Sequence, residues 1–271
     1  MTLPTYFISH GGGPWPYLTG PMRDSHRALE ASLQDMPRQL AALGHQPKAV
    51  LMVSAHWQEP AFTVMANAHP GMLYDYGGFP ANTYAVKYPA PGSPALAERV
   101  RSLVTAAGMV CRTDTQRGFD HGTFVPMQVM YPDADLPLLQ LSMQNGYDPQ
   151  AHIDLGRALA PLRDEGVLII GSGLSYHNMR MFGPAAQTPS KAFDGWLNET
   201  LAHTPPPERA TRLAHWADAP GARQSHPQED HLIPLMVALG AAQHESATRV
   251  YHEQHFAGGA VVSSYRFGGA T

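Results

Sequence analysis

The chain has 271 residues, only 15% of them are charged, and the formal net charge is −4. It has no basic stripe and no block of like charge, which argues against nucleic acid or an anionic membrane as a partner. Cys111 is the only cysteine, so an internal disulfide and a cysteine-based zinc cluster are excluded.

A single cysteine is also typical of a reducing compartment. The first residues, MTLPTYFISHGGG, lack the basic start and apolar core of a secretion signal. The apolar runs are too short to span a bilayer. These features together predict a cytoplasmic protein.

Short apolar runs alternate with amphipathic stretches along the whole chain. Strands are predicted at 4–9, 48–54, 61–67, 136–143, 167–172, 248–252 and 259–266. Helices are predicted at 22–43, 93–107, 123–131, 150–163, 189–203 and 230–242. Runs such as AVLMV and VLIIG are apolar on both faces, as in strands covered by helices on both sides. The pattern predicts an α/β protein with three αβα layers and a mostly parallel or mixed sheet, folded as a single domain over 1–271.

Local signals mark several helix ends. Ser93 is a candidate N-cap with Pro94 at the first helical position, and Asp148 precedes Pro149 in the same way. Gly44 and Gly108 follow their helices as expected for C-caps.

Two stretches, 68–92 and 204–229, lack regular periodicity but contain aromatic residues. Long loops of this kind in a compact domain are more often lids or site walls than linkers. Tyr74, Phe79 and Tyr84 either form a wall for an aromatic ligand or simply hold the first loop in place.

Three histidines stand just past predicted strands: His10 in TYFISHGGGPW, His56 in AVLMVSAHW and His177 in VLIIGSGLSYHN. Ligands of α/β proteins gather outside the carboxyl ends of the strands, so the three imidazoles are expected at one edge of the sheet. Imidazole binds zinc and also suits iron. The pattern therefore favours a metal site at that edge.

Each signal alone leaves alternatives open. The glycines after His10 could turn around a phosphate, although their spacing matches no phosphate-binding motif. His56 could be a core histidine that bonds a backbone carbonyl. The GSGLS segment before His177 has Ser175 where a nucleophile elbow requires glycine.

Two more histidines precede predicted helices. His121 follows Asp120, a candidate helix cap, and His231 stands shortly before Pro234, which suits a first helical turn. Five histidines at strand ends or helix starts strengthen the metal prediction, with zinc and non-haem iron both acceptable. The others considered are predicted to be scattered surface residues: His26, His45, His69, His203, His244, His252 and His255.

Nine segments, in the same order along nearly the whole chain, resemble the DOPA-dioxygenase-type extradiol ring-opening enzymes of the class III extradiol superfamily. They are HGGGPW (10–15), VSAHW (53–57), YDYGGFP (74–80), YPAPGSPALAERV (88–100), GFDHGTF (118–124), MYPDADLPLLQLS (130–142), LRDEG (162–166), HNMR (177–180) and EDHLIPLMVALGA (229–241).

The resemblance implies one divalent metal ion, Fe(II) for ring cleavage or zinc in its place, and a catechol-type substrate with O2. It implies His10, His56 and His231 as metal ligands. It places His177 at the metal too, either as a fourth ligand or as the acid/base, and makes His121 a proton donor or substrate anchor.

This chain departs from the wider superfamily at the third ligand, where a carboxylate is usual and His231 stands here beside Glu229 and Asp230. The segment HWADAPGARQSHPQED does not resemble the insertion of plant pigment-forming members, so their substrate is not transferred. Two other functions remain open at this point: a zinc hydrolase, which needs no redox step, and a binding module without activity, because fold alone does not fix function.

Overall fold

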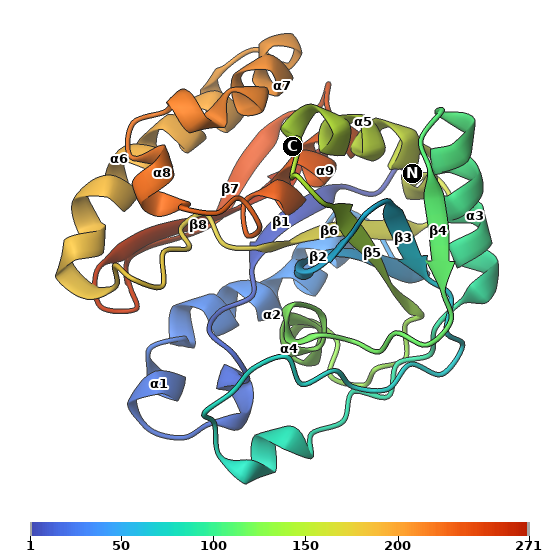
Figure 1. Cartoon of the computed structure of the whole chain (residues 1–271), viewed down its shortest axis with the longest axis horizontal. Coiled ribbons are helices and arrows are strands. Elements are labelled where there is room, and N and C mark those ends of the chain that lie inside the picture. Colours follow the sequence, from blue (N-terminus) through green and yellow to red (C-terminus); the bar gives the residue numbers. More distant parts are fainter. Residues whose placement is uncertain (1, 270–271) are drawn as a thin grey trace.

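The computed structural model describes residues 2–269 and is built around one eight-stranded sheet with the order β4-β3-β5-β2-β6-β1-β8-β7 (Figure 1). The strands are β1 Thr5–Ser9, β2 Ala49–Glu59, β3 Phe62–Met65, β4 Cys111–Asp114, β5 Leu138–Gln144, β6 Val167–Gly173, β7 Ala247–Phe256 and β8 Ala260–Phe267. Strands β5, β2, β6 and β1 are parallel neighbours. Strand β3 runs antiparallel to β5 and parallel to β4, and β8 runs antiparallel to both β1 and β7. The sheet is therefore mixed, as predicted.

Helices cover both faces of the sheet, with α5 and α9 on one side and α2 and α4 on the other (Figure 1). The α-helices are α1 Pro21–Asp24, α2 Arg27–Ala42, α3 Pro94–Ala106, α4 His121–Met130, α5 Pro149–Leu159, α6 Gln187–Asn198, α7 Pro206–Ala214, α8 Ala222–Ser225 and α9 Ile233–Ala241. Short turns of other helix types are η1 Trp15–Tyr17, η2 Ala81–Tyr84, η3 Ala160–Arg163, η4 Gly183–Ala186, η5 Glu199–His203 and η6 Trp216–Asp218. Within residues 2–269, no helix is both long and apolar enough to cross a membrane.

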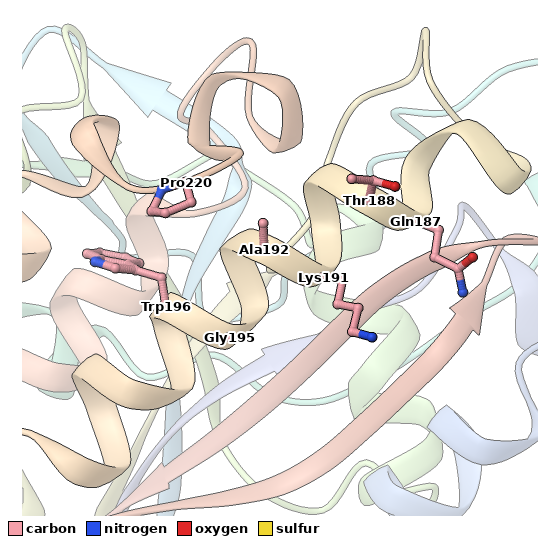
Figure 2. Close-up of a pocket in the computed structure, with 7 residues that line it drawn as sticks. All are labelled: Gln187, Thr188, Lys191, Ala192, Gly195, Trp196 and Pro220. Carbon is pink, nitrogen blue, oxygen red and sulfur yellow. The ribbon is translucent and has the colours of Figure 1, made fainter.

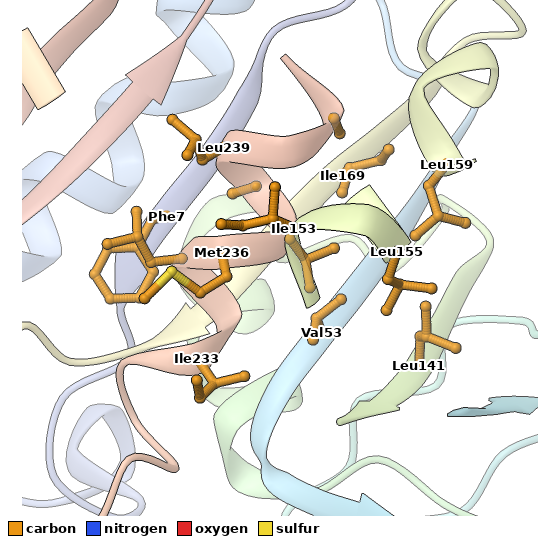
Figure 3. Close-up of a cluster of buried hydrophobic side chains, with 14 of the residues drawn as sticks. Phe7, Val53, Leu141, Ile153, Leu155, Leu159, Ile169, Ile233, Met236 and Leu239 are labelled. Atoms are coloured by element: carbon orange, nitrogen blue, oxygen red, sulfur yellow. The ribbon is translucent and has the colours of Figure 1, made fainter. Parts of the chain in front are cut away.

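The core is divided by the sheet into two apolar clusters. Successive side chains of a strand point to opposite faces, and in β2 Val53 joins the cluster under α5 and α9, whereas Met52 joins the cluster under α2 and α4. Figure 3 shows the first cluster, with Val53 beside Ile153 of α5 and Met236 of α9. The three-layer αβα prediction is confirmed.

The helix-end predictions agree with the structure. The side chains of Ser93 and Asp148 accept hydrogen bonds from backbone N–H groups in the first turns of α3 and α5. Gly44 and Gly108 adopt positive φ angles of 75° and 82° beyond α2 and α3, where a residue with a side chain would be strained.

Four sequence predictions were wrong in detail. The short, polar edge strand β4 was missed, and β2 continues well past its predicted end at residue 54. The predicted helix 22–43 is broken into α1 and α2 at Ser25 and His26. The supposed loop 204–229 contains α7 and α8. Helix α7 buries only three residues, including Arg209, and has few apolar side chains that could mark it as a helix in the sequence.

Candidate metal centre

The three strand-end histidines do meet at one edge of the sheet. His10 follows the last residue of β1, and His177 lies shortly beyond β6. His56 lies inside β2, within the stretch between Val53 and Gln58 where the pairing with β5 shifts register. The ring centroids of His10 and His56 are 5.0 Å apart.

The two helix-start histidines join them. His121 is the first residue of α4, which Asp120 caps by accepting a hydrogen bond from the N–H of Thr123 at 3.1 Å. The ring of His121 lies 3.9 Å from that of His56. His231 precedes α9, and its ring stacks on that of His177 at 3.4 Å with an angle of 21°. The structure therefore brings all five predicted histidines together.

Their potential metal-binding atoms form two adjacent groups among the described residues. Within each group these atoms lie within 4.8 Å of one another: His10, His56 and His121 form one group, and His177, Asp230 and His231 form the other. The ring of His231 is 5.2 Å from His10 and 4.9 Å from His56. The predicted ligands His10, His56, His177 and His231 are thus divided between two groups that touch.

Hydrogen bonds fix the same tautomer on three of the rings. The Nδ1 atom of His10 lies 2.9 Å from the carbonyl oxygen of Gly11, that of His121 lies 2.8 Å from Asp75, and that of His231 lies 2.8 Å from Asp230. Each acceptor requires Nδ1 to carry the proton, which leaves the Nε2 lone pair free. This is the arrangement by which metal-binding histidines are usually oriented.

The free lone pairs converge. The Nε2 atoms of His10 and His56 are 3.3 Å apart. Neighbouring nitrogen ligands at about 2.0–2.1 Å from a tetrahedral ion lie about 3.4 Å apart, so the spacing suits a shared cation. Burial lowers the pKa of His10 and His231 well below the usual value, and it lowers the pKa of His56 and His177 to about 4. Neutral imidazoles in this arrangement fit a divalent metal.

Asp75 was not identified from the sequence, although it contacts two histidines of the site. One carboxylate oxygen accepts hydrogen bonds from the backbone N–H (3.0 Å) and Nδ1 (2.8 Å) of His121, and the other lies 3.4 Å from Nδ1 of His56. Burial opposes ionisation of Asp75, but the bonds from His121 and the nearby His56 outweigh it and lower its pKa. The sequence feature that could have identified Asp75 is its place in YDYGGFP, one of the segments that resemble the extradiol enzymes.

Asp230 is a second acidic residue of the site. Its Oδ2 atom bonds His231, while Oδ1 is buried without a hydrogen-bond partner and lies 3.9 Å from Nδ1 of His177. Burial, with Glu229 nearby, raises the pKa of Asp230 to about 6.

A buried network supports His56 from behind. The backbone N–H of His56 donates to Ser54 Oγ (3.2 Å), and Ser54 donates to Asp120 (2.7 Å). Arg117 donates to Asp120 (3.0 Å) and to the carbonyl oxygen of His56 (3.3 Å). Gly122 leaves room for the ring, because a Cβ atom there would lie 2.8 Å from His56 Cδ2.

The histidines line a cavity of about 640 Å³, called here the histidine cavity. Phe79 lines it together with Tyr76, in agreement with the first of the two alternatives considered for Phe79. Tyr74 instead donates to the carbonyl oxygen of Val86 and helps to hold the loop. His26 was predicted on the surface but is buried against this cavity, with its ring stacked on Trp15 at 5.1 Å.

A larger hollow of about 770 Å³ lies elsewhere, along α6 (Figure 2). Its lining contains one ionisable side chain, Lys191, beside Trp196 and Pro220. It brings together no set of acids, bases or metal ligands, so the histidine cavity is the candidate site.

The sequence profile of a family described as the catalytic LigB subunit of aromatic ring-opening dioxygenase matches residues 4–268. The chain belongs to this family. It is 39% identical to a 4,5-DOPA dioxygenase extradiol of Beta vulgaris, over 97% of this chain and 96% of that protein. It is 35% identical to the protein of that name in Escherichia coli K12, over 88% and 85% of the two chains.

A solved structure agrees with these matches. The crystal structure of an uncharacterized protein, JW3007 from Escherichia coli K12, superimposes with a TM-score of 0.77 at 31% sequence identity, covering 98% of this chain and all of that one. The resemblance noted from the sequence is confirmed. The activity of the chain is therefore that of an extradiol ring-cleaving dioxygenase, with an aromatic substrate and O2.

Proposed function

We propose that the protein is an Fe(II)-dependent dioxygenase that opens the ring of a catechol, and that 1–271 form a single catalytic domain. The observation that carries the proposal is the convergence of neutral imidazoles, with the Nε2 atoms of His10 and His56 3.3 Å apart. When bound, Fe(II) supplies a centre at which both catechol oxygens and O2 are held side by side and electrons pass to O2. A cytoplasmic location is part of the proposal, because the single Cys111 suits a reducing compartment.

His10, His56 and His231 are the proposed ligands. Their rings lie 4.9 to 5.2 Å apart in each pair, and His10 and His231 are fully buried. Asp230 and the carbonyl of Gly11 hold two of these rings with Nε2 unprotonated.

His177 is the proposed base that takes the remaining catechol proton. Its ring lies parallel to that of His231, which favours a position beside the ion over shared coordination with His231. The family resemblance implies an alternative, in which His177 is a fourth metal ligand. Burial lowers the pKa of His177 to about 4, so the ring is uncharged at neutral pH and one of its nitrogens has a lone pair that can accept the proton.

His121 is the proposed proton donor or anchor for a substrate oxygen. Asp75 holds its Nδ1 proton and so directs Nε2 toward the cavity side of the ring. A proton that Nε2 first takes up from the substrate side and then gives back from this position would assist cleavage of the O–O bond, and both oxygen atoms of O2 would end in the ring-opened product.

Anaerobic loading with Fe(II), followed by a panel of catechols, tests the activity. We expect a yellow ring-opened product with one O2 consumed per catechol. Absence of ring opening with every catechol, together with ester or amide hydrolysis by the zinc-loaded protein, would replace this proposal with a zinc hydrolase. A catechol bound without turnover would indicate a binding module.

Metal content distinguishes ligands from catalytic residues. His56→Ala and His231→Ala should lose the ion, whereas His121→Ala should keep it and lose turnover. Because the structure groups His121 with His10 and His56, the reverse result for His121 and His231 would exchange their roles.

A further inference from the structure

We propose that the histidine cavity selects catechols whose ring substituent is apolar and uncharged, and that it discriminates against a carboxylate on that substituent. This inference rests on the proposed catechol cleavage and adds the substrate class. The observation behind it is the side-chain chemistry of the cavity away from the histidines.

The wall and mouth of the cavity are apolar. Their larger side chains are Met22, Phe79, Leu174, Met179, Phe182 and Phe256. In the described part of the chain only four large apolar side chains are exposed, and two of them, Met22 and Met179, belong to this lining. Met179 is 71% exposed. Exposed apolar side chains gathered around one opening mark a surface that binds an apolar group.

The cavity lining contains neither lysine nor arginine. The two hydroxyl groups of the lining, those of Ser25 and Tyr76, already donate to the carbonyl oxygens of Met22 and Thr83. A carboxylate that leaves water without a cationic partner loses much of its solvation free energy. Asp230, the one carboxylate in the lining, adds repulsion toward an anion. A substrate with an anionic substituent therefore meets an unfavourable site, whereas an alkyl or aryl substituent gains contact with methionine and phenylalanine.

Two arginines directly follow the methionines of the cavity lining in sequence, but neither belongs to the lining itself. Arg23, next to Met22, pairs with Glu30 at 2.5 Å and lies over the ring of Trp15 at 5.2 Å. Arg180, next to Met179, is exposed and does not line the cavity. The flexible thioether side chains at the opening can adapt to apolar groups of different shape.

Matched substrates test the inference with the Fe(II)-loaded protein. Catechol reports ring opening itself, while 4-propylcatechol and 3-(3,4-dihydroxyphenyl)propanoate share a chain length and differ in the terminal methyl or carboxylate. The methyl ester of the acid restores neutrality with its polar atoms kept. We expect kcat/KM for the propyl compound and the ester to exceed that for the acid by roughly tenfold or more.

Met179→Lys places a cation at the opening, and Met179→Gln is the neutral control. The lysine variant should raise the ratio of kcat/KM for the acid to kcat/KM for the propyl compound, whereas the glutamine variant should leave that ratio near the wild-type value. Because Met179 is exposed, neither change should disturb folding.

Catechol cleavage with equal kcat/KM for the acid and the propyl compound would overturn the apolar selection and leave the proposed activity intact. If no catechol is opened, the proposed function fails. In that case anaerobic calorimetry measures the binding of the same compounds without turnover. Equal dissociation constants for the acid and the propyl compound would reject the apolar selection.

Discussion

Replacing Asp75 by asparagine keeps the shape of the side chain and removes its negative charge. Asp75 accepts two hydrogen bonds from His121, at 2.8 and 3.0 Å, and faces Nδ1 of His56 at 3.4 Å. An amide has one oxygen acceptor, so its NH2 group must face one of the two imidazoles. The imidazole that faces the NH2 group loses its acceptor, and the other imidazole keeps an acceptor that has lost its negative charge.

The size of the effect follows from these contacts. A hydrogen bond to a charged group contributes about 1.5–3 kcal/mol, and loss of a carboxylate behind a metal-binding histidine typically costs about 10–100-fold in metal affinity or activity. We expect the Kd for the ion to rise by about that factor. We also expect kcat at saturating Fe(II) to fall, because His121 is affected together with His56.

Competition with a chelator measures the Kd, and O2 uptake under saturating Fe(II) measures kcat. Asp154→Asn is the control, since Asp154 is exposed on α5 and pairs only with neighbours on its own helix. A variant of Asp75 with both constants within about twofold of wild type would refute the positioning role.

Three further changes probe the support of the site and the fold. In Gly122→Ala the new Cβ would lie 2.6 Å from Ser54 Oγ and 2.8 Å from His56 Cδ2, so metal affinity should fall about tenfold and the unfolding temperature should fall too, as chelator titration and thermal melting would show. In Gly240→Ala it would lie 2.1 Å from a carbonyl oxygen of α5, so the free energy of unfolding should fall by about 1–3 kcal/mol, measured in urea. Burial lowers the pKa of His152 to about 4, against about 6.5 when unfolded, so its contribution to stability is complete above pH 6.5 and is lost as the pH falls toward 4. Between pH 7.5 and 5 this amounts to about 2 kcal/mol, and metal-free His152→Gln should show a smaller decrease in unfolding free energy than wild type over that interval; equal decreases would contradict the assignment.

Sequence signals were sufficient where the determinants are local. The caps at Ser93 and Asp148 and the apolar runs of β1, β2 and β6 depend on neighbouring residues, and all were predicted. Strand β4 was not predictable in this way, because its four residues, CRTD, are polar and partly exposed and gain their strand geometry from pairing with β3.

His26 shows where local reasoning fails. Nothing in its own segment distinguishes it from a surface histidine, but its Nε2 atom accepts the N–H of Gly12 at 3.1 Å and its ring stacks on Trp15. The contacts that bury it are made by the glycine turn after His10. This turn directly follows His10, a residue of the metal site. His26 therefore reaches the cavity through a contact between segments that only the folded structure creates.

The position of His231 is likewise determined far from its own helix. A Cβ atom at Gly173 of β6 would lie 2.1 Å from the carbonyl oxygen of His231, and one at Gly171 would lie 2.2 Å from that of Pro234. The start of α9 can therefore rest directly on β6 only because these two strand residues are glycines. The N–H of Leu174 then donates to the carbonyl oxygen of His231 at 3.0 Å and fixes the contact. Any side chain at Gly173 would displace His231 from His10 and His56, so this glycine is as necessary to the proposed metal site as the third imidazole that it admits.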